Sequence, residues 1–165
     1  LKKGRRVEEL EQFALNDSMT GMYNRNAYDY FVKNEKDFEG YVIVTFDLNN
    51  LKQCNDQYGH RAGDEYIINA AHIIEDNFER YGKCYRIGGD EFCCIIPKGR
   101  YFKIERVMHK IDQDVEILNH KNIIPVPVGI AYGYAVFTAD DTDPEKVRER
   151  ADKDMYRNKK AMKQS

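Results

Sequence analysis

The sequence predicts one α/β (α+β) domain, a sandwich in which helices flank a central, mostly antiparallel sheet of about five strands. Its 165 residues are the size of a single domain, and their hydrophobic share of 42% is enough for a packed core. Short runs of β-branched and aromatic residues alternate with longer segments of helical periodicity. Their order is strand, helix, strand, strand, helix, strand, helix. We see no internal repeat and no second domain.

Several runs have the composition of strands. The first is rich in β-branched and aromatic residues and stops abruptly at Asp47, so we expect a buried strand there. The next two are joined by the tetrapeptide Gly88-Gly89-Asp90-Glu91, which has the length and the residues of a hairpin turn. The last run is interrupted by Gly129 and Gly133. The runs cover residues 41–46, 83–87, 92–96 and 126–137.

Apolar residues at helical spacing predict helices over residues 62–80 and 101–119. Asp64 would lie in the first turn of the former, where the helix dipole favours a carboxylate. Asn24 is a candidate cap for a short helix over residues 26–33. The tripeptide Asp143-Pro144-Glu145 offers the last helix a cap, a first-turn proline and an acidic residue.

Composition excludes several classes of protein. Charged residues make up 33% of the chain, but the formal net charge is only −2, so nothing indicates a general nucleic-acid binder. No apolar run approaches the roughly 20 residues that cross a bilayer. We therefore expect no direct membrane insertion and a cytoplasmic location, including that of a cytoplasmic domain in a membrane-bound receptor.

The cysteines have neither the spacing nor the histidine neighbours of a zinc site. We interpret them as small buried hydrophobes in a reducing compartment, with two adjacent ones facing opposite sides of a strand. They are Cys54, Cys84, Cys93 and Cys94.

Residues 1–16 are charged and predict a helix in which Val7, Leu10 and Ala14 recur at coiled-coil spacing. Two interpretations stay open because two heptads are too few to decide. The helix either packs on its own domain or ends a signalling stalk that pairs two chains. We assign residues 1–16 to this linker or signalling helix and residues 17–165 to the main domain. The chain begins with Leu1, which suggests a fragment with an upstream sensory domain.

The predicted hairpin has features of a ligand site. Two glycines in a turn allow positive φ and let a bulky ligand approach the backbone. Asp90 and Glu91 follow the bend directly, so at least one carboxylate projects from the tip. Acidic hairpin tips are usually only solvated turns, and the hairpin alone therefore favours the structural interpretation.

Asp47 changes that balance. It ends an apolar strand, where a carboxylate is either costly or useful. If this strand neighbours the hairpin in the sheet, Asp47 and Asp90 converge. Two carboxylates with a backbone carbonyl suit Mg²⁺ bound together with phosphates, as phosphoryl transfer requires.

The segment between them, residues 51–64, combines a cation (Lys52), an amide (Asn55), a carboxylate (Asp64) and two glycines. An amide and a carboxylate together can recognise guanine, because the carboxylate accepts hydrogen bonds from N1–H and the exocyclic amine. A lysine can stabilise the charge of a triphosphate. By spacing alone, a polar loop with an Asn/Asp turn is the favoured interpretation.

Five linked motifs resemble the GGDEF family in order and spacing, over nearly the whole chain after Asn16. That family contains diguanylate cyclases, and its fold is similar to the palm of nucleotidyl polymerases and class III nucleotide cyclases. The motifs are Asp17-x-Met-Thr-Gly-Met-x-Asn-Arg25, Phe46-Asp-Leu-Asn-Asn-Leu-Lys52, Asn55-Asp-x-Tyr-Gly-His-x-x-Gly-Asp64, Arg86-x-Gly-Gly-Asp-Glu-Phe92 and Ala151-Asp-x-x-Met-Tyr156.

The resemblance implies a chemistry, the condensation of two GTP molecules into cyclic di-GMP by a homodimer. It implies that Asp47, the carbonyl of Leu48 and Asp90 hold Mg²⁺, with Mn²⁺ as an alternative. Asp90 and Glu91 are both candidates for activating the 3′-hydroxyl, and the sequence does not choose between them. The two hairpin glycines, Gly88 and Gly89, would let the triphosphate lie against the turn.

The resemblance also implies contacts to GTP outside the hairpin. Lys52 would neutralise phosphate charge as it develops. Asn55 and Asp64 would recognise guanine, with His60 as a further substrate contact. Lys159 and Lys163 lie one helical turn apart, where the family usually has a lysine and an arginine that contact phosphates. A basic terminal helix is also typical of a solvated end.

The chain departs from the family's pattern in two places. Asn49 replaces a common aspartate that is not expected to bind metal. Many relatives carry an Arg-x-x-Asp pair that binds the product and inhibits, and Glu79 and Gly82 stand in its place here. We therefore expect this inhibition to be absent.

Two alternatives to an active cyclase remain. The first is a degenerate domain that binds GTP as a sensor, and the carboxylates Asp47, Asp90 and Glu91 count against it. The second is a pure dimerisation module driven by the N-terminal helix, for which nucleotide would not shift the melting temperature.

Overall fold

The computed structural model describes residues 14–100 and 102–164, with backbone only for 160–164. The predicted N-terminal helix lies almost wholly outside these residues. The elements follow in the order α2 (Arg25–Asn34), β1 (Val42–Asn49), α3 (Leu51–Tyr58), α4 (His60–Phe78), β2 (Lys83–Arg86), β3 (Glu91–Ile96), α5 (Ile104–His120), β4 (Gly129–Val136) and α6 (Pro144–Gln164). The predicted α+β class is therefore confirmed.

In the described part of the chain, the sheet has four strands in the order β2-β3-β1-β4, and every neighbouring pair is antiparallel. The expectation of about five strands was slightly too high. The run 126–137 yields a single strand, because β4 passes without a break through Gly129 and Gly133 while pairing with β1.

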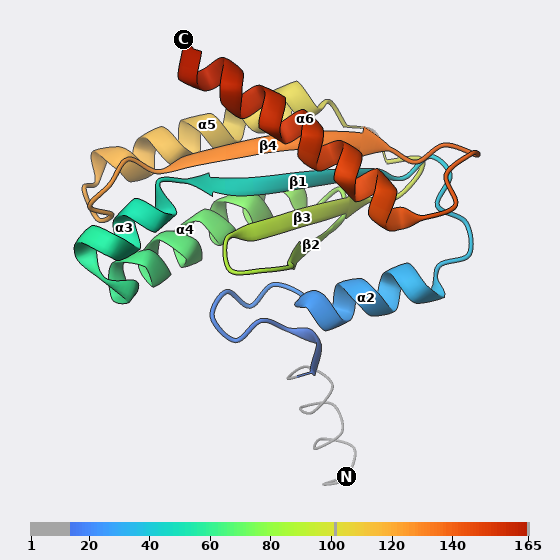
Figure 1. The fold of residues 1–165 in the computed structure, drawn as a ribbon, viewed down its shortest axis with the longest axis horizontal. Coiled ribbons are helices and arrows are strands. Elements are labelled where there is room, and N and C mark those ends of the chain that lie inside the picture. The colour runs from blue at the N-terminus through green and yellow to red at the C-terminus, as the bar shows by residue number, and fades with distance from the viewer. Residues whose placement is uncertain (1–13, 101, 165) are drawn as a thin grey trace, which may run out of the picture.

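Both faces of the sheet are covered (Figure 1). On one face, α4 and α5 pack over side chains such as Val44, Phe46 and Cys94. On the other face, α2 and α6 pack over Ile43 and Cys93. This alternation is the period-2 pattern of a strand buried on both sides. It confirms the opposite orientations predicted for Cys93 and Cys94, and all four cysteines are free and buried.

Strand β1 is longer than predicted. It does not stop at Asp47 but continues to Asn49, because residues 47–49 pair with Ala131, Ile130 and Gly129 of β4. On its other side, the register with β3 ends at Asp47 opposite Glu91. The last two residues of β1 therefore have a strand neighbour on one side only.

The segment expected to be a polar loop is helical. Residues 51–58 form α3, and a glycine at φ +90°, Gly59, separates it from α4. Helix α4 begins at His60, earlier than predicted, so Asp64 lies in its second turn rather than its first. The predicted cap of α2 is confirmed, because the side chain of Asn24 accepts a hydrogen bond from the amide of Ala27 at 3.0 Å.

Candidate active site

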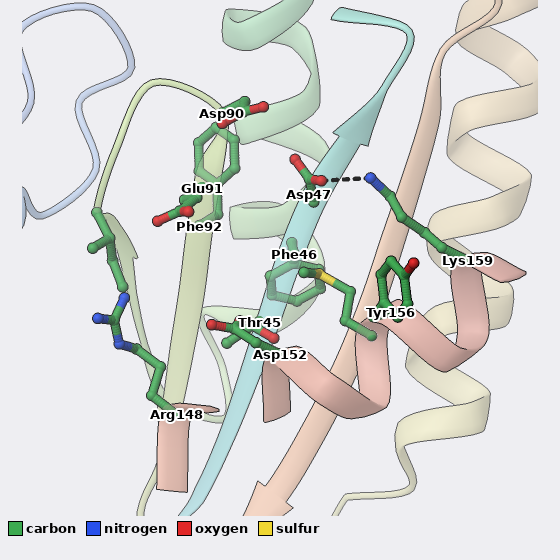
Figure 2. A pocket seen from close by; sticks show the side chains of 12 residues that line it. Thr45, Phe46, Asp47, Asp90, Glu91, Phe92, Arg148, Asp152, Tyr156 and Lys159 are labelled. Carbon is green, nitrogen blue, oxygen red and sulfur yellow. Dashed lines mark hydrogen bonds and ion pairs between the residues drawn. The ribbon is translucent and has the colours of Figure 1, made fainter. Parts of the chain in front are cut away.

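Three acidic residues line one pocket where β1 and β3 pair. Asp47 of β1 stands opposite Glu91 of β3 in the antiparallel register, and Asp90 precedes Glu91 at the hairpin tip. All three line a pocket of about 480 Å³ between the sheet and α6. Figure 2 shows Asp47 and Asp90 at one end of this pocket, with Glu91 on the neighbouring strand. The predicted neighbourhood of the strand and the hairpin is therefore confirmed.

The acidic side chains at this end of the pocket disfavour each other's negative charge. Burial raises the pKa of Asp90, and the adjacent Asp47 carboxylate raises it further. Two carboxylates that disfavour each other's charge are suited to a divalent cation placed between them. Within residues 14–100 and 102–164, no group of three His, Cys, Asp or Glu side chains could hold a metal by itself.

Lys159 of α6 enters this end of the pocket. Its Nζ lies 2.5 Å from Oδ2 of Asp47, and Oδ1 of Asp47 accepts a hydrogen bond from the amide of Leu48 at 2.9 Å. The dashed line in Figure 2 marks the lysine contact. Leu48 is buried in the core between β1 and the helices. Lys163 belongs to α6, but its side chain lies outside the description.

Four of the candidate contacts to GTP lie on α3 and α4, at the end of β1 (Figure 1). They do not line the pocket under α6. The side chains of Lys52, His60 and Asp64 are exposed, and that of Asn55 is half-buried. The candidate site residues therefore fall into two regions near the end of β1. One is the acidic pocket under α6, and the other is the pair of helices α3 and α4.

Asn55 has a fixed position in that hairpin. Its side chain rests on the backbone of Gly63, where a Cβ atom would lie only 1.7 Å from Oδ1 of Asn55. Gly63 is thus required for α3 and α4 to approach with Asn55 between them. This contact brings the Asn55 amide next to the turn of α4 that carries Asp64.

The hairpin glycines do not use the positive φ that glycine allows, because neither Gly88 nor Gly89 has one. A Cβ on Gly88 would make ordinary contact with Glu91 at 3.5 Å, and one on Gly89 would meet nothing within 4 Å. Neither the backbone conformation nor packing requires glycine here. What remains is open space above the backbone of Gly89.

Four further polar side chains line the pocket, and none of them was assigned a role from the sequence. Arg148, Asp152 and Tyr156 come from α6, and Thr45 comes from β1. Burial raises the pKa of Asp152, although the Thr45 hydroxyl and the Arg148 guanidinium partly oppose that rise. The signal in the sequence was their spacing, since residues 148, 152, 156 and 159 fall on one helical face.

Where many relatives carry the Arg-x-x-Asp pair, this chain has no room for a side chain at Gly82. At Gly82 a Cβ would lie 2.1 Å from the carbonyl oxygen of Ile95 on β3. An aspartate cannot occupy this turn without moving the strand. Glu79 is exposed on the same turn.

Comparison with known proteins agrees with this architecture. The family described as "Diguanylate cyclase, GGDEF domain" matches residues 14–165. The diguanylate cyclase DgcS of Shewanella oneidensis is 29% identical over 158 residues, which are 92% of this chain and 52% of DgcS. The bifunctional diguanylate cyclase/cyclic di-GMP phosphodiesterase MucR of Pseudomonas aeruginosa is 30% identical over 157 residues, 90% of this chain and 22% of MucR. The chain thus spans about half of DgcS and less than a quarter of MucR.

Solved structures show the same fold. The coiled coil and GGDEF domain of DgcB from Caulobacter crescentus, in complex with c-di-GMP, has a TM-score of 0.79 at 23% identity, over 97% of this chain and 88% of that one. Diguanylate cyclase SiaD from Pseudomonas aeruginosa, in complex with its activator SiaC, has a TM-score of 0.77 at 23% identity, over 97% and 64%. With its motifs, its fold and the family match over residues 14–165, this chain belongs to the GGDEF-domain family of diguanylate cyclases.

Proposed function

We propose that this chain is an active diguanylate cyclase, which condenses two GTP molecules into cyclic di-GMP and two pyrophosphates. The observation that carries the proposal is the register of β1 and β3, which sets Asp47 opposite Glu91 and beside Asp90. A degenerate sensor would have no need of this arrangement. The relatives named as diguanylate cyclases support the same reaction.

The donor set fits Mg²⁺. Asp47 and Asp90 offer two carboxylates whose charges oppose each other, and Leu48 offers a backbone carbonyl. Mg²⁺ commonly takes one or two carboxylates and completes its shell with substrate phosphates and water. When bound, the ion would polarise the α-phosphate and lower the pKa of the attacking hydroxyl. Mn²⁺ prefers the same oxygen ligands.

The reaction needs two nucleotides held face to face. Each 3′-oxygen forms a bond to the α-phosphorus of the other GTP, each α-phosphorus loses pyrophosphate, and each hydroxyl proton leaves to a base. Asp90 and Glu91 are both within the pocket and are the candidates for that base. One site holds one GTP, so two chains must meet, and we propose a homodimer.

The remaining residues bind and orient the substrate. We assign guanine recognition to the Asn55 amide and the Asp64 carboxylate, with His60 beside them at the start of α4. Lys52 and Lys159 would neutralise phosphate charge from the two sides of the β1 terminus, and Lys163 would add to it. The space over Gly88 and Gly89 would receive the triphosphate.

The setting of the domain is also a proposal. We infer an upstream sensory domain and a cytoplasmic location, either free or attached to a membrane receptor. In residues 14–100 and 102–164, no helix combines the length and apolarity that a membrane span needs.

The test is incubation of the purified chain with GTP and MgCl₂, with identification of the product by mass spectrometry. We expect cyclic di-GMP, with a specific activity that rises with protein concentration because the productive species is a dimer. Asp47→Asn is the matched negative control, since it keeps the side-chain shape and removes the charge. Absence of product at every protein concentration contradicts the proposal, and GTP binding without product favours the sensor.

A further inference from the structure

The terminus of β1 has to be held by something other than the sheet. Asp47 is the last residue of β1 that pairs with β3, and from Leu48 on the strand pairs only with β4. Directly after Asn49 the chain reverses through Asn50, which has a left-handed φ of 66°, into α3. A strand end paired on one side and followed by a tight reversal is free to shift unless a third element fixes it.

That third element is a buried phenol from α4. The side chain of Tyr66 is fully buried. Its hydroxyl donates to the carbonyl of Asn49 at 2.6 Å and accepts from the amide of Gly129 at 2.9 Å, and the carbonyl of Gly129 lies 3.1 Å away. Asn49 and Gly129 are partners in the β1–β4 register. The Tyr66 hydroxyl therefore links Asn49 and Gly129, the last residue pair of the β1–β4 ladder.

Tyr66 is also connected to the nucleotide side of the site. It lies two residues after Asp64 on α4, and Gly63, which carries the Asn55 contact, is one residue before Asp64. A rigid helical turn thus joins the residues assigned to guanine with the phenol that holds β1. The distance between the base-binding residues and the metal carboxylates is set through this turn.

We propose that Tyr66 is a positioning residue, whose hydroxyl fixes the β1 terminus, and with it Asp47 and Leu48, relative to the guanine-binding helix α4. This inference rests on the proposed function for its metal and nucleotide, but not for its geometry. Tyr66 itself touches neither the pocket nor the reacting atoms. It acts through the backbone of Asn49 and Gly129.

The test compares Tyr66→Phe with Tyr28→Phe. Both remove one hydroxyl from an almost fully buried ring, but the hydroxyl of Tyr28 donates to Glu145, at the start of α6. Three quantities are measured for each variant: the melting temperature, the affinity for Mn²⁺ without nucleotide, and amide hydrogen exchange. Both variants should lose some thermal stability, so the melting temperature serves to compare their general cost.

The other two quantities separate positioning from general stability. In Tyr66→Phe we expect Mn²⁺ affinity to fall about tenfold. We also expect faster amide exchange at residues 48–50 and at Gly129. Tyr28→Phe should change neither. If Tyr66→Phe matches the wild type in both, the proposal is overturned. If the wild type binds neither Mn²⁺ nor GTP, the proposed function fails, and the exchange rates alone then support or overturn the positioning of the strand.

Discussion

The charged Asp90 side chain destabilises the folded protein, and a catalytic role would explain why it is there. Burial and the Asp47 carboxylate raise its pKa above the ordinary value, so the folded chain binds the proton more tightly than the unfolded chain does. Its contribution to stability is thus present at low pH and is lost as the pH rises through the raised pKa. At neutral pH the charged side chain opposes folding.

Asp90→Asn should therefore separate stability from activity. We expect the free energy of unfolding at pH 7 to stay equal or rise by about 0.5 kcal/mol, a small value because solvent screens the half-buried group. We expect turnover to fall about a hundredfold or more, since the amide cannot replace a charged ligand or base. Urea unfolding and product formation measure the two effects. A variant that loses stability but keeps turnover would refute the assignment.

Asp64 provides a test of substrate choice. Its carboxylate is exposed on α4, beside the Asn55–Gly63 contact, and adenine offers it no N1–H donor. Asp64→Ala should lower the preference for GTP over ATP by about 30-fold or more, because a hydrogen bond to a charged group is lost. Metal affinity should change little.

The neighbouring acid is a matched control for that experiment. Glu65→Ala removes an equally exposed carboxylate from the same helix, and Glu65 has no assigned ligand contact. Competition of the two nucleotides for binding gives the preference directly. An Asp64→Ala protein that still distinguishes GTP from ATP as the wild type does would show that the guanine site lies elsewhere.

At the level of elements, α6 protects the outer edge of β4. Three α6 side chains spaced four residues apart meet backbone groups two residues apart on the strand. Arg150 donates to the carbonyl of Val136 at 3.1 Å, Asp154 accepts from the amide of Tyr134 at 3.0 Å, and Asn158 donates to the carbonyl of Tyr132 at 2.8 Å. An uncovered edge strand is a template for pairing with another chain.

We expect the double variant Asp154→Ala/Asn158→Ala to cost about 1–3 kcal/mol of unfolding free energy, because two hydrogen bonds are lost. We also expect it to associate at high concentration through the opened edge of β4. Denaturant unfolding and light scattering measure these effects. Lys153→Ala, an exposed position on the same helix, is the control. Equal scattering by the double variant and this control would contradict edge protection.

Much of the element pattern could be predicted from the sequence, and the misses have physical causes. Strand β1 was found because its residues are buried on both faces, but its last two residues, 48 and 49, are strand only through pairing with β4. Helix α3 was missed because it buries only Leu51 and Cys54, which leaves almost no apolar period to detect. Local patterns reveal an element when its own side chains bury it, and fail when tertiary pairing defines it.

The candidate site divides in the same way. The meeting of Asp47 with the hairpin followed from one assumption about strand neighbours, which the register confirms. The face of α6 that lines the pocket could not be predicted in this way, because Arg148, Asp152 and Lys159 are polar and resemble a solvated helix face. These polar side chains matter because they face the carboxylates Asp47 and Asp90 across the pocket. The sequence does not show which residues a helix faces.

At the level of the whole molecule, one ion pair joins the N-terminal segment to the hairpin. Arg86, just before the hairpin tip, binds Asp17 at 3.1 Å, and its other nitrogen donates to the carbonyl of Gly89 at 2.9 Å. Both partners are largely buried. One arginine therefore holds the hairpin turn and the segment before α2 together.

Asp17→Asn should loosen both connections. Burial raises the pKa of Asp17, but hydrogen bonds from Thr20 and Arg86 outweigh that effect and lower it below the ordinary 3.8. The stability it contributes is therefore present above pH 4 or so and lost as the pH falls through the lowered pKa. We expect the variant to lose about 1–2 kcal/mol of unfolding free energy at pH 7. The difference in unfolding free energy between the wild type and the variant should shrink at acidic pH.

A second ion pair gives the control. Asp29→Asn breaks the exposed pair of Arg25 and Asp29 on α2, which should be worth only a few tenths of a kcal/mol. We expect turnover to fall severalfold in Asp17→Asn and to stay unchanged in Asp29→Asn, because only the former releases the carbonyl of Gly89 through Arg86. Equal turnover in the two variants would mean that the hairpin keeps its shape without the N-terminal segment. A selective loss would show that the segment before α2 holds the hairpin in its active shape.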